Sequence, residues 1–390
     1  MKKIILSLLL LSSVIFAQGN KMNEVQKVID DVRNQYAPDK RTAIFDVQVT
    51  EENGNIVLSG ATNLVDAKNE LSNKLSSFKV TNKIETLPAK ELGNKIYGVV
   101  PLSVANLRVK PGHSEEMATQ ALLGMPVLVY KQRGGNWLVK TPDDYIAWID
   151  ELQLMDKSEY DNWMSSQKVI YTEHYGMSYS EKNEKSIPVS DLVAGDILKY
   201  LAKEDSFYKV EYPDKRIAYV PEDNAEMFDS YVQKCELTPE NILHTAKSLM
   251  GVPYLWGGTS TKGVDCSGFT KTVYFLNGVI LPRDASQQVF SGDSVDITNG
   301  YENLQPGDLV FFGARARDGK KERVSHVGIY LGNMEFIHSS GSVRINSFDK
   351  EKDNFSEYRT NSLLKAKRII NAKNLWGIKP LKDISSTTLY

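Results

Sequence analysis

The sequence predicts a multidomain chain in which a small α+β module and two small all-β barrels precede a larger C-terminal α+β domain. At 390 residues the chain exceeds the usual size of one domain. Its apolar pattern changes near residue 97 from helical spacing to short strands, and near residue 238 it becomes helical again. In the last part the helices come first and antiparallel strands follow, which is typical of an α+β domain.

The first 17 residues have the composition of a secretory signal peptide. Lys2 and Lys3 form a basic start, an apolar run follows from Ile4 to Leu11, and Ala17 is a small residue at the expected cleavage point. A membrane anchor is the alternative, but the apolar run is shorter than the ~20 residues that span a bilayer. We therefore expect an exported protein, periplasmic or extracellular, with no membrane span after removal of the signal.

Composition narrows the range of partners. Without residues 1–17 the net charge is −4, and no basic stripe with interleaved aromatic residues occurs, so nucleic acid is not an expected partner. Cys235 and Cys266 are the only cysteines, too few for a disulfide scaffold, and export alone leaves open whether they pair. No cofactor is predicted, and the sequence is silent on oligomeric state.

Residues 20–90 have the pattern of a small α+β module. Apolar periodicity predicts, in order, a helix over 21–35, strands over 43–49 and 55–59, a helix over 64–75 and a strand over 78–87. This order, with the turn Val57-Leu-Ser-Gly60, resembles the BON-type modules of exported bacterial proteins. An unrelated small α+β domain is the alternative.

Residues 96–155 and 168–225 each predict a small barrel of short strands separated by turns. In the first, Ala105-Asn-Leu-Arg108 and Tyr145-Ile-Ala-Trp148 resemble segments of bacterial SH3-like domains. The second is more degenerate, with Tyr208-Lys-Val210 echoing the first copy. The polar, helix-prone residues 155–167 between them are predicted to be a linker.

Residues 238–370 form the predicted α+β domain, and residues 371–390 a C-terminal tail. Thr238-Pro239 predicts a helix start, because threonine caps and proline is tolerated at the first helical position. The strands expected beyond it cover 308–312, 327–331, 334–338, 343–345 and 363–369.

A second helix is predicted to begin at Asp265 and to end at Asn277-Gly278. Asp265 is then the N-cap and Cys266 lies in the first turn, where the helix dipole and unpaired N–H groups favour a thiolate. Cys266 is therefore a candidate nucleophile. The alternative is a buried or disulfide-bonded cysteine.

Two of the five histidines, His326 and His338, bracket a predicted hairpin. A two-residue turn at Gly332-Asn333 would pair His326 with Ser339 and place the imidazoles on opposite faces of the sheet. A loop with an odd number of residues centred on Gly332 would pair His326 directly with His338, with β-carbons about 4.5–5.5 Å apart. Because a cysteine nucleophile needs a base and a group that orients it, we predict the odd loop.

Six segments of residues 238–370 resemble the NlpC family of papain-like cell-wall cysteine peptidases, in the family's order. They are Tyr254-Leu-Trp-Gly-Gly258, Asp265-Cys-Ser-Gly-Phe269, Arg283-Asp-Ala-Ser-Gln287, Gln305-Pro-Gly-Asp-Leu309, Ser325-His-Val-Gly-Ile329 and Phe336-Ile-His338. Six ordered motifs are far more specific than any one of them. With the signal peptide and the SH3-like domains, the chain resembles the γ-D-glutamyl-L-diamino acid endopeptidases, which cleave peptidoglycan stem peptides.

The resemblance implies catalytic roles for four residues. Cys266 would attack the γ-carbonyl of D-glutamate, and His326 would form an ion pair with it and later protonate the leaving amine. His338 would orient His326. The Tyr254 hydroxyl and the Cys266 backbone N–H would receive the oxyanion.

The resemblance also implies a pocket for the free amine of the substrate's L-alanine. Asp265 and Ser267 would hold the amine, with Asp265 keeping one oxygen turned outward while it caps the helix. Glu116 and Tyr145 of the first SH3-like domain would complete the pocket and close the cleft beyond it.

Each role has a structural alternative. His326 could be a strand-edge histidine, and His338 a packed one. Tyr254 and Trp256 could be core aromatics, and for Trp256 we prefer that interpretation. Glu116 could instead be a solvated surface residue, and Tyr145 could belong to the core of the barrel. The sequence is as compatible with these positions as with substrate contact.

Three other functions are compatible with parts of the sequence. One is an endopeptidase of intact, crosslinked wall with SH3-like anchors, another a non-catalytic wall-binding protein, and the third an acyltransferase of the same broad fold. Zinc bound by Cys266, His326 and His338 is disfavoured, because the close-spaced ligand pairs of structural zinc sites are missing.

Overall fold

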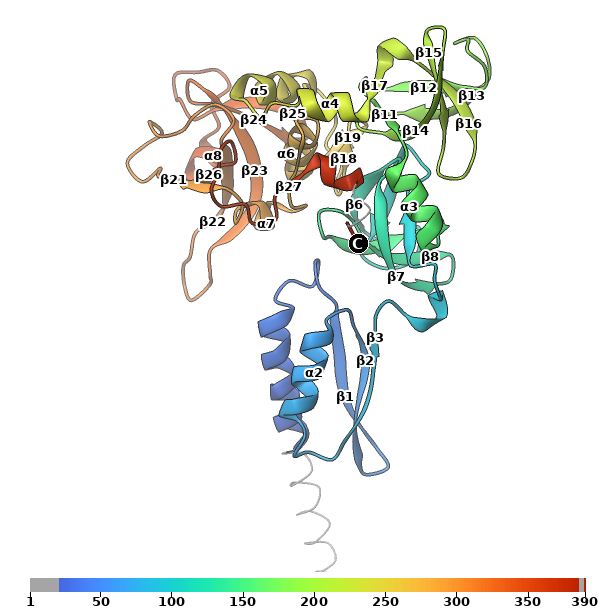
Figure 1. Ribbon diagram of the computed structural model, residues 1–390. Coiled ribbons are helices and arrows are strands. Elements are labelled where there is room, and N and C mark those ends of the chain that lie inside the picture. Colours follow the sequence, from blue (N-terminus) through green and yellow to red (C-terminus); the bar gives the residue numbers. More distant parts are fainter. Residues whose placement is uncertain (1–20, 386–388) are drawn as a thin grey trace, which may run out of the picture. The chain divides into compact units, whose positions relative to one another are not determined.

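A computed structural model describes residues 21–385 and 389–390 of the chain (Figure 1). The predicted signal peptide lies outside the described residues. The chain divides into two compact units between Gly93 and Asn94, and each is described by itself. Within the described ranges, no helix is both long and apolar enough to cross a membrane.

The first unit has two helices and a three-stranded sheet in the predicted order. A helix covers residues 21–36, and the remaining elements are β1 (Phe45–Glu52), β2 (Asn55–Thr62), α2 (Val65–Lys74) and β3 (Val80–Thr86). β1 and β2 are antiparallel, and β3 pairs parallel to β2. The β1–β2 turn is formed by Asn53 and Gly54, both with positive φ, which matches the right-handed twist of the hairpin.

The second unit begins with a seven-stranded sheet, which is formed by the residues of the first predicted barrel. Its strands are β4 (Tyr97–Val99), β5 (Val104–Arg108), β6 (Met117–Leu122), β7 (Pro126–Arg133), β8 (Asn136–Lys140), β9 (Ile146–Ile149) and β10 (Gln153–Met155). They are hydrogen-bonded in the order β10-β4-β7-β8-β9-β5-β6.

A second sheet repeats this connectivity strand for strand. Its strands are β11 (Lys168–Tyr171), β12 (Gly176–Tyr179), β13 (Pro188–Leu192), β14 (Ile197–Glu204), β15 (Phe207–Glu211), β16 (Ile217–Pro221) and β17 (Ala225–Met227). The order β17-β11-β14-β15-β16-β12-β13 is that of the first sheet, shifted by seven strands.

The prediction of barrels needs correction, because each described sheet has two ends and does not close. The reason lies at one junction in each sheet. In the first, β5 pairs with β9 only through Leu107 and Arg108, and in the second, β12 pairs with β16 only through Tyr179. The β5–β6 and β12–β13 hairpins are therefore attached to the rest of their sheets by one or two residue pairs only, and neither hairpin closes its sheet into a barrel.

The prediction that residues 155–167 form a linker is also partly wrong. It forms α3 (Lys157–Ser165), which starts with a capping box between Asp156 and Glu159. Tyr160, Trp163 and Met164 on this helix are buried in a cluster that includes Val99 and Met155 of the first sheet. Residues 157–165 therefore pack against the first SH3-like sheet.

The last part of the second unit combines helices with a six-stranded antiparallel sheet. The helices are α4 (Phe228–Lys234), α5 (Pro239–Ser248), α6 (Cys266–Phe275), α7 (Ala285–Gln288) and α8 (Glu357–Ser362). The sheet runs β21 (Asp293–Val295), β26 (Leu363–Arg368), β22 (Leu309–Ala314), β23 (Arg323–Gly332), β24 (Glu335–Ser340) and β25 (Ser342–Ser347). Two small pairs complete it: β18 (Thr259–Ser260) with β19 (Gly263–Val264), and β20 (Val279–Ile280) with β27 (Lys379–Pro380).

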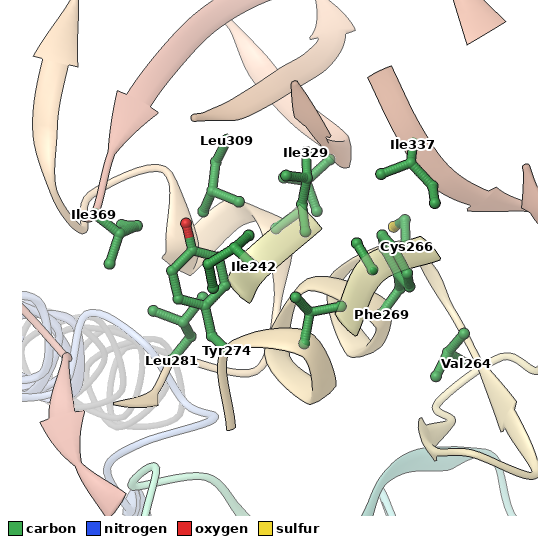
Figure 2. Packing of buried hydrophobic residues seen from close by; sticks show 14 of the residues in the cluster. Ile242, Val264, Cys266, Phe269, Tyr274, Leu281, Leu309, Ile329, Ile337 and Ile369 are labelled. Atoms are coloured by element: carbon green, nitrogen blue, oxygen red, sulfur yellow. The ribbon is translucent and has the colours of Figure 1, made fainter. Parts of the chain in front are cut away.

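The helix that begins at Cys266 packs against one face of this sheet. Phe269 of α6 shares a buried cluster with Ile329 of β23 and Ile337 of β24, and the three side chains lie close together in Figure 2. A separate cluster of aromatic residues contains Phe312, which lies next to Phe311 of the first cluster on β22. Because neighbours on a strand point to opposite faces, the sheet is covered on both sides.

Candidate active site

Cys266 occupies the predicted position at the start of α6. Asp265 caps the helix, since its Oδ1 accepts from the Gly268 N–H at 2.7 Å. The thiol is 9% exposed and lies against the backbone N–H of Val327, the residue after His326. Burial raises the pKa of Cys266 to about 11, although the N–H groups of Val327 and Ser267 act to lower it. Desolvation therefore outweighs the helix start and favours the thiol, whereas the sequence predicts a thiolate.

The two predicted histidines meet on one face of the sheet. His326 Nε2 and His338 Nδ1 are 2.7 Å apart, and both side chains are more than nine-tenths buried. Burial lowers the pKa of both imidazoles, and the Arg359 charge lowers them further. Both are therefore neutral near pH 7, so His326 is available as a base.

The register that brings them together differs from the predicted one. The turn is the two-residue Asn333-Met334, and His326 does not pair directly with His338. Gly332 opposes Glu335, but the next pair is Tyr330 with Phe336, so Leu331 forms a bulge. This extra residue changes the parity of the register, and the histidines lie on the same face as diagonal neighbours.

Asn346 of β25 extends the histidine pair. Its Oδ1 lies 2.8 Å from His338 Nε2, while its Nδ2 donates to the Asn354 carbonyl at 2.9 Å and so fixes the amide orientation. Because Oδ1 only accepts, His338 Nε2 carries the proton and His338 Nδ1 accepts from His326 Nε2–H. The relay leaves His326 Nδ1 unprotonated. No local pattern in the sequence singles out Asn346.

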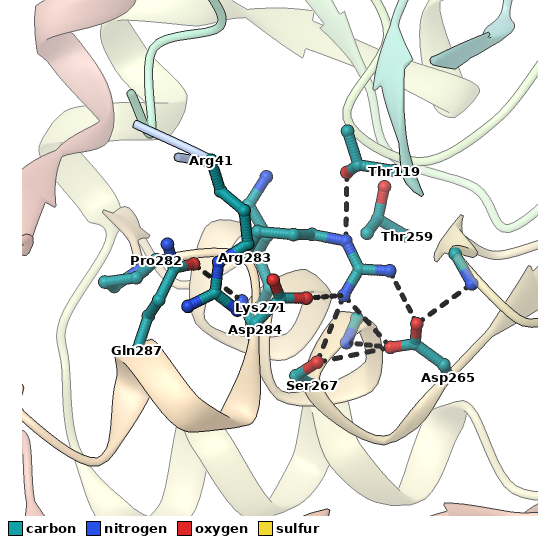
Figure 3. Close-up of polar contacts among 12 residues, drawn as sticks. Arg41, Thr119, Thr259, Asp265, Ser267, Lys271, Pro282, Arg283, Asp284 and Gln287 are labelled. Atoms are coloured by element: carbon teal, nitrogen blue, oxygen red, sulfur yellow. Dashed lines mark hydrogen bonds and ion pairs between the residues drawn. The ribbon is translucent and has the colours of Figure 1, made fainter. Parts of the chain in front are cut away.

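A buried ion pair involves Asp265, the residue before Cys266. Arg283 is 1% exposed, and its Nη2 lies 2.6 Å from Asp265 Oδ2 (Figure 3). Its Nη1 donates to Asp265 Oδ1 and to Ser267 Oγ, each at 3.1 Å. Burial acts to lower the pKa of Arg283, but the Asp265 carboxylate outweighs it and holds that pKa above its usual range. Arg283 stands in one of the six sequence motifs, where nothing indicated this partner.

Asp265 has little capacity left for a ligand. Besides Arg283, Oδ1 accepts from Gly268 and Ser267, and Oδ2 accepts from the Gly257 N–H at 3.0 Å. The expected outward-facing oxygen is thus already occupied. The structure places Asp265 at the centre of a polar cluster that fixes the start of α6.

The first SH3-like sheet forms one wall of this site. Glu116 accepts from Trp256 Nε1 at 2.9 Å, and Gln120 Oε1 accepts from the Thr259 N–H at the same distance. Thr119 Oγ1 accepts from Arg283 Nε at 3.0 Å, and a Cβ on Gly257 would lie 2.7 Å from the Met117 carbonyl oxygen. The residues after Tyr254 therefore lie directly against β6.

Three aromatic residues differ in their surroundings. Trp256 is 61% exposed, so its interpretation as a core residue is wrong; its indole reaches across to Glu116. Tyr145 is buried within the first SH3-like sheet. Tyr254 is half-buried, and burial and the nearby Cys266 and Asp265 raise its pKa to about 12, so its hydroxyl stays protonated at neutral pH.

The remaining histidines and the second cysteine lie apart from this arrangement. His113 Nδ1 is 2.8 Å from Asp150, and His174 Nε2 is 3.2 Å from Ser248 Oγ. His244 is exposed on α5. Cys235 and Cys266 are both free, so the open question of a disulfide is answered.

A cysteine at a helix start, packed against the strand that carries His326 of a histidine pair, is the arrangement expected of a papain-like cysteine hydrolase. The NlpC/P60 family model matches residues 251–364, and the bacterial dipeptidyl-peptidase SH3 domain model matches residues 107–154. The chain belongs to the NlpC/P60 family and is a cysteine-type peptidase with an SH3-like domain. The family resemblance and the first SH3-like domain are thereby confirmed.

Curated relatives support this assignment. A gamma-D-glutamyl-L-lysine dipeptidyl-peptidase from Bacillus cereus is 32% identical over 242 residues, or 60% of this chain and 70% of the relative. A protein of the same name from Bacillus subtilis is 32% identical over 239 residues, which are 57% of this chain and 71% of the relative.

Two solved structures share the fold. A crystal structure of an NlpC/P60 family protein from Bacillus cereus covers 70% of this chain and 99% of its own, with a TM-score of 0.59 and 25% identity. An NlpC/P60 endopeptidase from Photobacterium damselae covers 91% of this chain and 84% of its own, with a TM-score of 0.51. At 17% identity, the latter supports the fold alone.

Replacing Asp265 by Asn should destabilise the protein strongly. The substitution leaves the buried Arg283 guanidinium with only the more distant Asp284 carboxylate, 3.9 Å from Nη1, and breaking a buried pair costs about 3–5 kcal/mol. Urea unfolding measures the loss. The matched control is Asp161→Asn in an exposed pair with Lys157, which should leave the midpoint nearly unchanged. Equal midpoints for the two variants would show that the buried pair does not support the fold.

Replacing Asn346 by Ala should lower kcat roughly 5- to 10-fold with little change in KM, because one hydrogen bond that sets the tautomer is lost. Asn346→Asp keeps the acceptor and adds a negative charge, so it should restore kcat and move the acidic limb of the pH–rate profile upward. A purely structural role predicts no such movement. An unchanged profile for Asn346→Asp would refute the tautomer argument.

Acidification should destabilise the catalytic domain through its histidines. Their folded-state pKa values lie below the usual value of about 6.5, so the unfolded chain takes up protons first. Stability is then present above about pH 6.5 and is lost as the pH falls toward the folded-state pKa values. His338→Gln should flatten this dependence in urea unfolding between pH 7.5 and pH 5, whereas the exposed control His244→Gln should not. Identical slopes would contradict this origin of acid sensitivity.

Proposed function

We propose that the protein is an exported cysteine peptidase that hydrolyses the γ-D-glutamyl-L-diamino acid bond of peptidoglycan stem peptides with a free N-terminal L-alanine. The names of the curated relatives support the bond and the substrate class. The observation that carries the proposal is the direct contact of β6 with the residues around the nucleophile. A wall at this position limits how far the substrate can extend beyond the L-alanine.

The proposed chemistry uses the neutral groups of the free enzyme. Cys266 Sγ attacks the γ-carbonyl carbon while its proton passes to His326 Nδ1, which the histidine relay leaves unprotonated. The Tyr254 hydroxyl and the Cys266 N–H donate to the oxyanion. His326 then returns the proton to the leaving amine, and water attacks the thioester with His326 as base.

The amine of L-alanine is proposed to bind between the SH3-like wall and the start of α6. Glu116 is exposed, and its carboxylate is held by Trp256 Nε1, so it can pair with an ammonium group. Ser267 and Tyr145 complete the pocket in this proposal. Asp265 contributes indirectly, because it holds Arg283 and Ser267 in place.

The decisive assay is mass spectrometry of the products from L-Ala-γ-D-Glu-L-Lys and its diaminopimelate counterpart, each with a free and an acetylated amine. The wild type should release L-Ala-D-Glu from the free peptides only, and Cys266→Ala should release none. Glu116→Gln should weaken the preference for a free amine, because the ammonium loses its counter-charge.

Two outcomes would contradict the proposal. Digestion of acetylated peptides or of intact sacculi at the same rate would favour the endopeptidase of intact wall. Full activity of Cys266→Ala would refute the mechanism. Cys235→Ala, which removes the other thiol, is the matched control and should remain active.

A further inference from the structure

Arg359 lies on the short helix α8 and faces the aromatic layer next to the catalytic histidines. Its guanidinium carbon is 5.6 Å from the centroid of the Phe312 ring and 5.3 Å from that of Tyr358. The Phe312 ring in turn lies 5.7 Å from the His326 ring. The guanidinium and the His326 imidazole therefore contact the same aromatic ring.

The charge of Arg359 acts on the whole catalytic group. It lowers the pKa values of His326 and His338, after burial, and it also acts to lower that of Tyr254. Ionised Cys266 would in turn stabilise the arginine. The guanidinium therefore belongs to the same electrostatic site as the nucleophile.

Arg359, which is half-buried, differs from Arg283 and Arg368 in having no carboxylate partner within the described part of the chain. Arg283 pairs with Asp265 at 2.6 Å, and Arg368 pairs with Asp308 at 2.8 Å. For Arg359, no carboxylate lies within ion-pair distance among residues 21–385 and 389–390. Burial lowers its pKa, as expected for a desolvated cation without a counter-charge.

An unpaired guanidinium in a substrate site suits a carboxylate. It offers N–H donors in a planar fork that matches a carboxylate bidentately, and partial burial strengthens the interaction. A γ-linked D-glutamyl residue keeps its α-carboxylate free, within the same residue as the carbonyl that Cys266 attacks. This carboxylate must therefore lie close to the nucleophile in the bound substrate.

We propose that Arg359 binds the free α-carboxylate of the D-glutamyl residue and selects substrates in which that group is not amidated. The inference rests on the proposed function and adds a substrate-binding residue to it. The carboxylate of the diamino acid is the other source of the same chemistry.

The test compares four peptides on the full-length enzyme: L-Ala-γ-D-Glu-L-Lys, its analogue with D-isoglutamine, and both again with the lysine carboxylate amidated. Arg359→Gln should lower kcat/KM for the two D-glutamate peptides on the order of 10- to 100-fold and change it little for the two D-isoglutamine peptides. Arg359→Lys should recover part of the loss.

Arg344→Gln is the matched control. Arg344 is exposed on β25 opposite His338 and also lowers the pKa of that histidine. Its replacement therefore measures the effect of removing a positive charge near the histidines without removing the proposed carboxylate-binding group. We expect nearly unchanged selectivity for this variant. Thermal unfolding of each variant checks that it is folded.

Several outcomes would overturn the inference. A loss that is equal for all four peptides, or equal in Arg359→Gln and Arg344→Gln, would assign Arg359 to the electrostatics of the nucleophile alone. If the loss in Arg359→Gln depended on whether the lysine carboxylate is amidated, the carboxylate bound by Arg359 would be that of the diamino acid. If the wild type cleaved none of the four peptides, the proposed function itself would fail.

Discussion

The buried ion pair of Asp265 and Arg283 is the interaction on which the site depends. One carboxylate caps α6 through Gly268, holds the loop at Gly257 and pairs with Arg283, which in turn donates to Thr119 of the SH3-like sheet. Taking two charges out of water is costly, and the cost is offset only where the remaining donors and acceptors are satisfied. Here they are, so the same pair positions the nucleophile and joins two domains.

Burial also sets the protonation of the catalytic groups. It raises the pKa of Cys266 and lowers those of His326 and His338, so that burial favours the neutral form of all three groups. In such a site the tautomer of the base decides whether a proton can be accepted. The tautomer is determined by a chain of hydrogen bonds that ends at the Asn354 carbonyl, a group with no titratable proton.

Local patterns predict the order of the elements and the position of Cys266 at a helix start, but they do not predict contacts between residues far apart in sequence. The cap at Asp265 and the element order of residues 21–87 follow from periodicity and turn chemistry, which are local. The hairpin shows the limit. Its parity depends on a bulge at Leu331, and a bulge arises from packing on both faces of the sheet.

The same limit explains the missed residues. Arg283, Asn346 and Arg359 contact residues on other elements, and no local pattern names those partners, not even the motif in which Arg283 stands. A core position is the interpretation preferred for Trp256 from the sequence, yet its side chain is exposed and donates to Glu116, 140 positions earlier in the chain. Such pairs become visible only when the domains are placed together.

Charged side chains without an ion-pair partner can determine the orientation in which a substrate binds. Asp265 and Arg283 neutralise each other in the interior, so they cannot discriminate between substrates by charge. In the proposed complex, Glu116 on the SH3-like wall and Arg359 on α8 are charges that a ligand can neutralise. An L-alanyl-γ-D-glutamyl group carries an ammonium at one end and a carboxylate next to the scissile amide. In the proposed complex each charge of that group meets its opposite, which fixes the γ-carbonyl, and not the α-carboxylate, in front of Cys266.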